Sequence, residues 1–113
     1  MKNFKDKVTV ITGGASGLGR EFALKAASLG MRIVIADVQR EALEATVSEL
    51  IALGARAIGQ VCDVRKSEQV QALADATIEE FGAVHLLFNN AGVASAGLIW
   101  ESTEADWDWV LGV

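Results

Sequence analysis

The chain has 113 residues, of which 10 are basic and 15 acidic, so its formal net charge is −5. This length is below the ~150 residues of an average domain, so we expect one domain with one core. The hydrophobic fraction of 51% and the charged fraction of 22% exclude a disordered chain. The acidic balance argues against nucleic acid or an anionic membrane surface as the main partner.

The amino-acid pattern also indicates the compartment. No apolar run approaches the ~18 residues of a membrane span. The apolar stretch at 8–12 is shorter than the ~7 residues that a signal peptide needs. The single cysteine, Cys62, cannot form an internal disulfide. We therefore expect a cytoplasmic protein without a membrane segment.

Short apolar runs alternate along the chain with patterns of helical spacing. The runs predicted as strands are residues 7–11, 32–36, 56–61 and 84–88. Each of the three helical patterns between them ends at a glycine, namely Gly30, Gly54 or Gly82, as helices commonly do. Ser67 is expected to be the N-cap of the third helix.

This alternation predicts the α/β class, with a Rossmann-type doubly wound parallel sheet. Right-handed crossovers give the strand order 3-2-1-4, with the first two helices on one face and the third on the other. The fourth strand then lies at an edge. Thr103 and Asp106 have the spacing of a capping box, which predicts the start of a fourth helix in which the sequence ends. We therefore expect residues 1–113 to be the N-terminal part of a single domain, truncated within that helix.

Three glycines, Gly13, Gly17 and Gly19, lie between the first strand and the first helix. A phosphate bound there needs backbone N–H groups at the helix N-terminus and no Cβ atom in its way, and glycines meet both needs. Asp37 ends the second strand, where a carboxylate normally binds the adenosine ribose of a dinucleotide. In the alternative interpretation the glycines only make a tight turn and Asp37 only caps the second helix.

The spacing of the glycines resembles that of one family. Residues 12–19, TGGASGLG, resemble the TGxxxGxG motif of the short-chain dehydrogenase/reductase family, in its ordinary and not its extended branch. Residues 89–92, NNAG, match a second motif of that family, and residues 62–64 match its adenine contact. Trp107, Asp108 and Val110 match its W-D-x-V helix.

The resemblance implies a binding site for a nicotinamide dinucleotide at the carboxyl ends of the strands. The residues implied at the pyrophosphate are Gly13, Ser16, Gly17, Leu18 and Gly19. The others are Asp37 at the adenosine ribose, Asp63 and Val64 at the adenine, and Asn90, Ala91 and Gly92 at the nicotinamide-side ribose. Thr12 would tie the first turn to the NNAG loop. NAD is expected in preference to NADP, because Asp37 would repel a 2′-phosphate.

The family performs its chemistry with an Asn, a Ser and a Tyr-x-x-x-Lys pair, and this chain contains no tyrosine. We therefore assign no catalytic residue and expect the 113 residues alone to be inactive. The parent is expected to be an NAD(P)-dependent oxidoreductase, a homo-oligomer that transfers hydride between nicotinamide and an alcohol or ketone. One alternative is a non-catalytic nucleotide-binding module. Another is an S-adenosylmethionine methyltransferase, which does not predict the NNAG motif.

Other conspicuous residues favour structural roles. A lone strand histidine, His85, is expected to be structural, and Cys62 is expected to act as a small hydrophobic residue. No metal-ligand spacing is present. The tryptophans, expected in the core or at subunit contacts, are Trp100, Trp107 and Trp109. The charged residues expected on a solvated helix face are Arg40, Glu41, Glu44 and Glu49.

Overall fold

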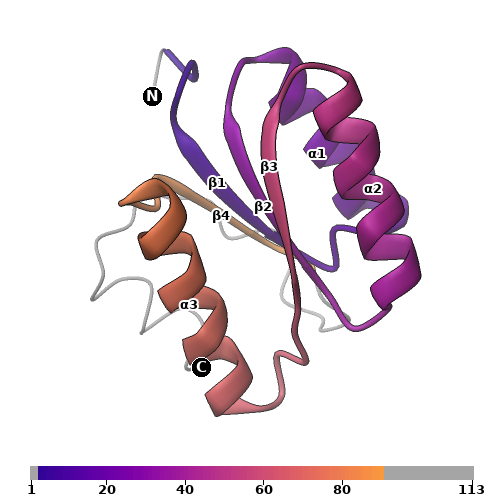
Figure 1. Cartoon of the computed structure of the whole chain (residues 1–113), viewed down its shortest axis with the longest axis vertical. Helices are drawn as coiled ribbons and strands as arrows, with labels where there is room; N and C mark the ends of the chain where they lie inside the picture. Colours follow the sequence, from indigo (N-terminus) through magenta and orange to yellow (C-terminus); the bar gives the residue numbers. More distant parts are fainter. Residues whose placement is uncertain (1–2, 91–113) are drawn as a thin grey trace.

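A computed structural model describes residues 3–90, which form a parallel sheet flanked by helices (Figure 1). The strands are β1 (Val8–Thr12), β2 (Arg32–Asp37), β3 (Arg56–Val61) and β4 (Leu86–Asn89). The helices are α1 (Gly17–Ser28), α2 (Arg40–Ala52) and α3 (Ser67–Phe81). The strand order is β3-β2-β1-β4, which confirms the predicted sheet and places β4 at an edge of its described part.

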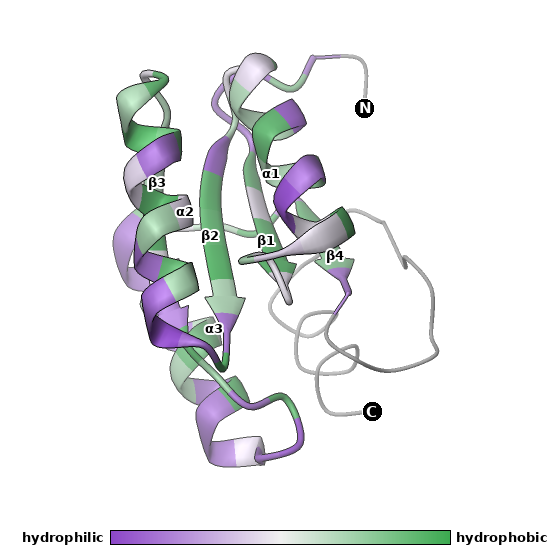
Figure 2. Cartoon of the chain, turned by 90° about the vertical axis from the view of Figure 1, so that its right-hand side faces the viewer, coloured by the Kyte–Doolittle hydropathy of each residue, from purple (hydrophilic) through white to green (hydrophobic). Residues whose placement is uncertain are grey.

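Helices α1 and α2 lie on one face of the sheet and α3 lies on the other, as predicted (Figure 1). Side chains of β1 and β2 alternate between the two cores, because successive strand residues point to opposite faces. Val10 and Val34 join the core beneath α3, whereas Ile11 and Ile35 join the core beneath α1 and α2. All five residues of β1 are buried, including Thr9 and Thr12, as expected of a strand that is covered on both faces. Figure 2 shows these inner strands largely in the hydrophobic colour.

The strand register brings the carboxyl ends of the strands to one edge of the sheet. Thr12 pairs with Ala36 of β2 and with Asn89 of β4. Asp37 in turn pairs with Val61 of β3. The segments that follow these strands therefore emerge side by side, where open α/β sheets bind their ligands.

The helices end at the predicted glycines, whereas the predicted N-cap of α3 is wrong. Gly30, Gly54 and Gly82 all have left-handed backbone angles just where the helices end. Ser67 is the first residue of α3, and its N-cap is Lys66, which makes no side-chain capping bond. The reason is a tight turn, closed by a 3.0 Å hydrogen bond from the Lys66 N–H to the Asp63 carbonyl, that starts the helix one residue earlier.

Several predictions fall outside the described residues. These are the fourth helix, the three tryptophans, Ala91 and Gly92. Within residues 3–90, no helix is long and apolar enough to cross a membrane.

Candidate functional site

The buried Thr12 hydroxyl joins the ends of β1 and β4. Its Oγ1 atom donates a hydrogen bond to Oδ1 of Asn89 at 2.8 Å and accepts one from the backbone N–H of Asn90 at 3.0 Å. The Thr12 residue is 0% exposed, so these bonds satisfy a hydroxyl that water does not reach. Thr12 therefore ties the glycine-rich turn to the start of the NNAG segment, as expected.

The turn between β1 and α1 is tight at one glycine and open at another. A Cβ atom on Gly19 would lie 2.2 Å from the Gly13 carbonyl oxygen, so packing of the turn requires glycine there. Gly17 has a φ of +56°, and a Cβ atom built on it meets no described atom within 4 Å. This combination of a left-handed backbone and free space is what close approach of a ligand to the main chain needs.

Helix α1 begins at this open glycine without a side-chain cap. Ser16 is its N-cap, with an extended backbone, and makes no side-chain capping bond. The first turn of α1 also holds no acidic residue. Within residues 3–90, no side chain caps the first N–H groups of α1, which together with the helix dipole favour an anion.

Asp37 connects the end of β2 to the same turn. Its Oδ2 atom accepts a hydrogen bond from the Ala15 N–H at 3.0 Å, and its Oδ1 atom accepts one from the Gln39 N–H at 3.1 Å. The N-cap of α2 is Gln39, so the interpretation of Asp37 as only a helix cap is wrong. An ionised carboxylate can accept about four hydrogen bonds, which leaves capacity for ligand hydroxyls.

The segment after β3 places a second carboxylate at this edge. Side-chain and backbone hydrogen bonds from Arg65 lower the pKa of Asp63 to about 2, so its carboxylate is ionised at neutral pH. The Arg65 guanidinium contacts both carboxylate oxygens, at 3.0 and 2.9 Å. From α3, Oε1 of Gln69 accepts the Asp63 N–H at 2.8 Å and fixes the loop, a role that the sequence did not reveal.

Cys62 and His85 carry side chains that can be reactive, but their contacts indicate structural roles. Cys62 is 2% exposed within the core beneath α3, and burial, followed by the Asp63 carboxylate, raises the pKa of its thiol. The Nδ1 atom of His85 accepts the Val8 N–H at 3.0 Å. His85 therefore lies where β1 begins, at the opposite end of the strand from the glycine-rich turn. Both assignments agree with the structural roles expected of them.

One predicted surface residue has a different role. Glu49 accepts two hydrogen bonds from the Arg20 guanidinium, at 2.8 and 2.6 Å, and so connects α2 to the first turn of α1. Its assignment to a solvated face was wrong, because spacing within one helix does not show which neighbouring helix faces it. Arg40, Glu41 and Glu44 are exposed, as predicted.

The glycine-rich turn, the N-terminus of α1 and the carboxylates of Asp37 and Asp63 therefore all lie at one edge of the parallel sheet. The sequence model of the short chain dehydrogenase family matches residues 7–113. The chain belongs to this family. Membership explains why its glycines follow the G-x-x-x-G-x-G spacing and not that of the general dinucleotide motif.

Known dehydrogenases and reductases resemble the chain over nearly its whole length. It is 41% identical over 113 residues to a CLA biosynthesis dehydrogenase/reductase of Lactiplantibacillus plantarum, covering 100% of this chain and 40% of that protein. It is 40% identical to a levodione reductase of Leifsonia aquatica, covering 97% of this chain and 42% of that protein. A short chain dehydrogenase/reductase from Burkholderia phymatum in complex with NAD is 59% identical, with a TM-score of 0.80, covering 100% of this chain and 40% of that one. The chain thus spans about two fifths of the length of these relatives.

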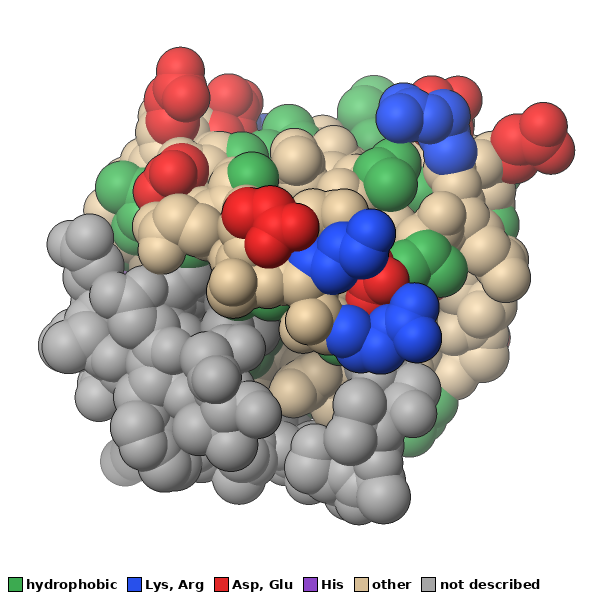
Figure 3. All heavy atoms as spheres, turned by 90° about the horizontal axis from the view of Figure 1, so that it is seen from below, with side chains coloured by type: hydrophobic (Ala, Val, Ile, Leu, Met, Phe, Trp, Pro, Cys, Tyr) green, Lys and Arg blue, Asp and Glu red, His purple; other side chains and the backbone are tan. Residues whose placement is uncertain are grey.

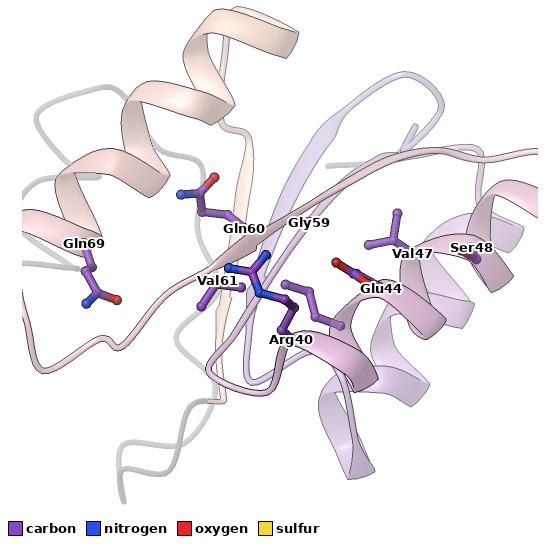
Figure 4. Close-up of a pocket in the computed structure, with 9 residues that line it drawn as sticks. Arg40, Glu44, Val47, Ser48, Gly59, Gln60, Val61 and Gln69 are labelled. Atoms are coloured by element: carbon purple, nitrogen blue, oxygen red, sulfur yellow. The ribbon is translucent and has the colours of Figure 1, made fainter.

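Beyond the family motifs, a groove of about 770 Å³ lies between α2 and β3 (Figure 4). Arg40 and Glu44 project into it from α2, and Gln60 lines it from β3. Gln69, which holds the Asp63 loop, borders it as well, so the groove adjoins the adenine end expected for a short-chain dehydrogenase. Seen from below, acidic side chains gather toward one side of the described surface, and basic side chains lie beside acidic ones toward the other side (Figure 3). Within residues 3–90, no three His, Cys, Asp or Glu side chains form a metal site.

Proposed function

We propose that the protein is an NAD(P)-dependent oxidoreductase that transfers hydride between nicotinamide and an alcohol or ketone. The observation that carries this proposal is the contact of Asp37 with the glycine-rich turn. One carboxylate there can hold the turn and accept hydrogen bonds from a ribose at the same time. Family membership supports the reaction class, and the described residues support the cofactor.

The open space over Gly17 fits a dinucleotide pyrophosphate, because a Cβ atom would fill the place that a phosphate oxygen needs. The residues proposed to hold the pyrophosphate are Gly13, Ser16, Gly17, Leu18 and Gly19. Asp37 would bind the adenosine ribose, and Asp63 with Val64 would bind the adenine. Asn90, Ala91 and Gly92 would line the nicotinamide-side ribose.

When bound, the nicotinamide supplies or accepts the hydride, and the described residues would bind the other parts of the dinucleotide that carries it. The first-turn N–H groups of α1 would donate hydrogen bonds to the pyrophosphate and stabilise its negative charge. Leu18 is 65% exposed and Val38 is 60% exposed, although both are large apolar residues. Such exposure at the edge of a site favours contact with flat apolar parts of a ligand, which would bury them. Val38 is a contact that the sequence did not predict.

We propose a preference for NAD over NADP. Ribose hydroxyls would donate charge-assisted hydrogen bonds to Asp37, each contributing roughly 1.5–3 kcal/mol. A 2′-phosphate at the same place would meet a like charge. The bound NAD in the relative from Burkholderia phymatum supports this choice. We further propose that the enzyme is cytoplasmic, which agrees with its free and buried Cys62. We also propose that it is a homo-oligomer.

The test is a titration of the full-length protein with NAD and NADP, followed by turnover assays with a panel of alcohols and ketones. NAD binding at least tenfold tighter than NADP, with nicotinamide-dependent turnover, is expected. Tighter binding of NADP would overturn the cofactor preference. Binding without turnover over the whole panel would favour the alternative, a nucleotide-binding module without catalysis.

A further inference from the structure

Thr46 is a buried polar residue in the middle of α2. It is 3% exposed, and its hydroxyl donates a hydrogen bond to the Ala15 carbonyl oxygen at 3.4 Å. Ala15 lies in the glycine-rich turn, 31 residues earlier in the chain. The bond is long, yet a buried hydroxyl that lost it would be left without a partner at a cost.

The Ala15 residue is held from two sides. Its N–H donates to Asp37 at the end of β2, and its carbonyl accepts from Thr46 on α2. The residue is 6% exposed and belongs to the core beneath α1 and α2, which also contains Leu43 and Leu50. The turn is therefore anchored to α2 by packing as well as by a hydrogen bond.

One turn further along α2, Glu49 holds Arg20 in the first turn of α1. Residues three apart lie on the same side of a helix, so Thr46 and Glu49 face α1 together. Helix α2 thus contacts both the turn that precedes α1 and the helix that follows it. Helix α2, which lies outside the sequence motifs, therefore helps to fix the position of the N-terminus of α1.

The Ala15 carbonyl and the Ser16 N–H belong to one planar peptide unit. The structure contains no cis peptide bond among the described residues, so this carbonyl and this N–H point in opposite directions. Fixing the carbonyl toward buried Thr46 therefore directs the Ser16 N–H away from α2. Ser16 is exposed, so this donor is directed away from the core that holds Thr46.

We propose that Thr46 is a positioning residue of the nucleotide site, which orients the Ser16 N–H for the pyrophosphate by holding the other end of the same peptide. This inference rests on the proposed function, since it names what α2 contributes to that site. It assigns to Thr46 an effect on ligands that carry a pyrophosphate and none on ligands without one.

The test compares Thr46→Val, which keeps the shape and removes the hydroxyl, with Thr46→Ser, which keeps the hydroxyl. Ser48→Ala is the matched control, because it removes an exposed hydroxyl from the same helix. Dissociation constants for ADP and adenosine are measured by NMR titration. Amide hydrogen exchange at residues 15–17 is measured without ligand, and thermal unfolding reports the stability of each variant.

Thr46→Val is expected to weaken ADP binding roughly threefold to tenfold, the equivalent of one net hydrogen bond, and to leave adenosine binding unchanged. It should also speed exchange at the Ser16 amide, while Thr46→Ser and Ser48→Ala match the unchanged protein. Equal weakening of ADP and adenosine, or no change in either, would overturn the inference and leave the proposed function intact. Absence of ADP binding by the unchanged protein would overturn the proposed function itself.

Discussion

The Oδ2 atom of Asp37 lies 3.0 Å from the backbone nitrogen of Ala15, so the acid that ends β2 holds the turn that follows β1. Its other oxygen accepts the Gln39 N–H at the start of α2. In the proposed site, ribose recognition and the shape of the pyrophosphate turn would therefore depend on the same carboxylate. Two elements that are far apart in sequence become one site through this side chain.

Removal of the Asp37 charge should affect both roles. Asp37→Asn keeps the shape of the side chain but replaces one acceptor oxygen with a donor, so we expect NAD binding to weaken at least tenfold. NADP binding should weaken less, because repulsion of its 2′-phosphate disappears together with the carboxylate. Isothermal titration of both cofactors measures the ratio. An unchanged ratio between NAD and NADP would contradict the placement of Asp37 at the ribose.

Alanine at Gly17 and at Gly19 should have different effects. Gly19→Ala places a Cβ atom 2.2 Å from the Gly13 carbonyl oxygen, so the turn must open and the protein should lose several kcal/mol of stability. Gly17→Ala meets no described atom within 4 Å and should cost only about 1–2 kcal/mol for its left-handed backbone. It should nevertheless weaken nucleotide binding, because the new methyl group occupies the free space. Urea unfolding and ADP titration separate the two effects, and equal losses of stability would be inconsistent with this geometry.

Much of this site could be predicted because its motifs are local in sequence. The glycine-rich turn and Asp37 at a strand end were predicted from the order of strand, turn and helix, whereas the role of Thr12 was implied by the resemblance to the family. The contacts of Thr46 and Gln69 could not be predicted, because each joins a helix to a loop outside it. The spacing of residues within one helix does not show which loop packs against that helix. Glu49 was misassigned for the same reason: its partner Arg20 lies on another helix, 29 residues away. The prediction of Ser67 as the N-cap was wrong because the turn between Asp63 and Lys66 places the start of α3 one residue earlier.

Arg65 should control the titration of Asp63. The pKa of this carboxyl is lowered to about 2 by hydrogen bonds from Arg65, so the interaction stabilises the fold above the ordinary carboxyl pKa. That contribution is lost as the pH falls through about 2, when the carboxylate becomes protonated in the folded state. Arg65→Ala should raise the pKa of Asp63 toward its ordinary value, as followed by NMR of the side-chain carboxyl carbon. A pKa that stays near 2 in the variant would show that Arg65 is not the cause.

Cys62 should react slowly in the folded protein. Its thiol is 2% exposed, and burial together with the Asp63 carboxylate raises its pKa, so little thiolate is available at pH 8. A thiol reagent should modify it at a rate limited by unfolding, and urea should accelerate the reaction by orders of magnitude. Modification in native buffer as fast as in urea would show that the β3–α3 segment opens far more than this packing implies.

Residues 1–113, expressed alone, should not turn over any substrate. They contain no tyrosine, and the single histidine is bound to the backbone where β1 begins, far along the strand from the glycine-rich turn. The absorbance of the reduced nicotinamide should change no faster than it does without protein, and the longer protein that we propose contains these residues is the positive control. Turnover by residues 1–113 would identify a catalytic group among residues assigned here to structure, and His85→Ala would be the first variant to test.

The central claim is that one edge of the sheet binds a nicotinamide dinucleotide, and chemical-shift mapping of backbone amides during NAD titration tests it most directly. The account predicts that the largest shifts fall on residues 13–19, on Asp37 and Val38, on Asp63 and Val64, and on Asn90. His85 and its partner Val8, at the other end of the strands, should shift little. Largest shifts confined to the groove between α2 and β3, or no saturable shifts at all, would contradict the account.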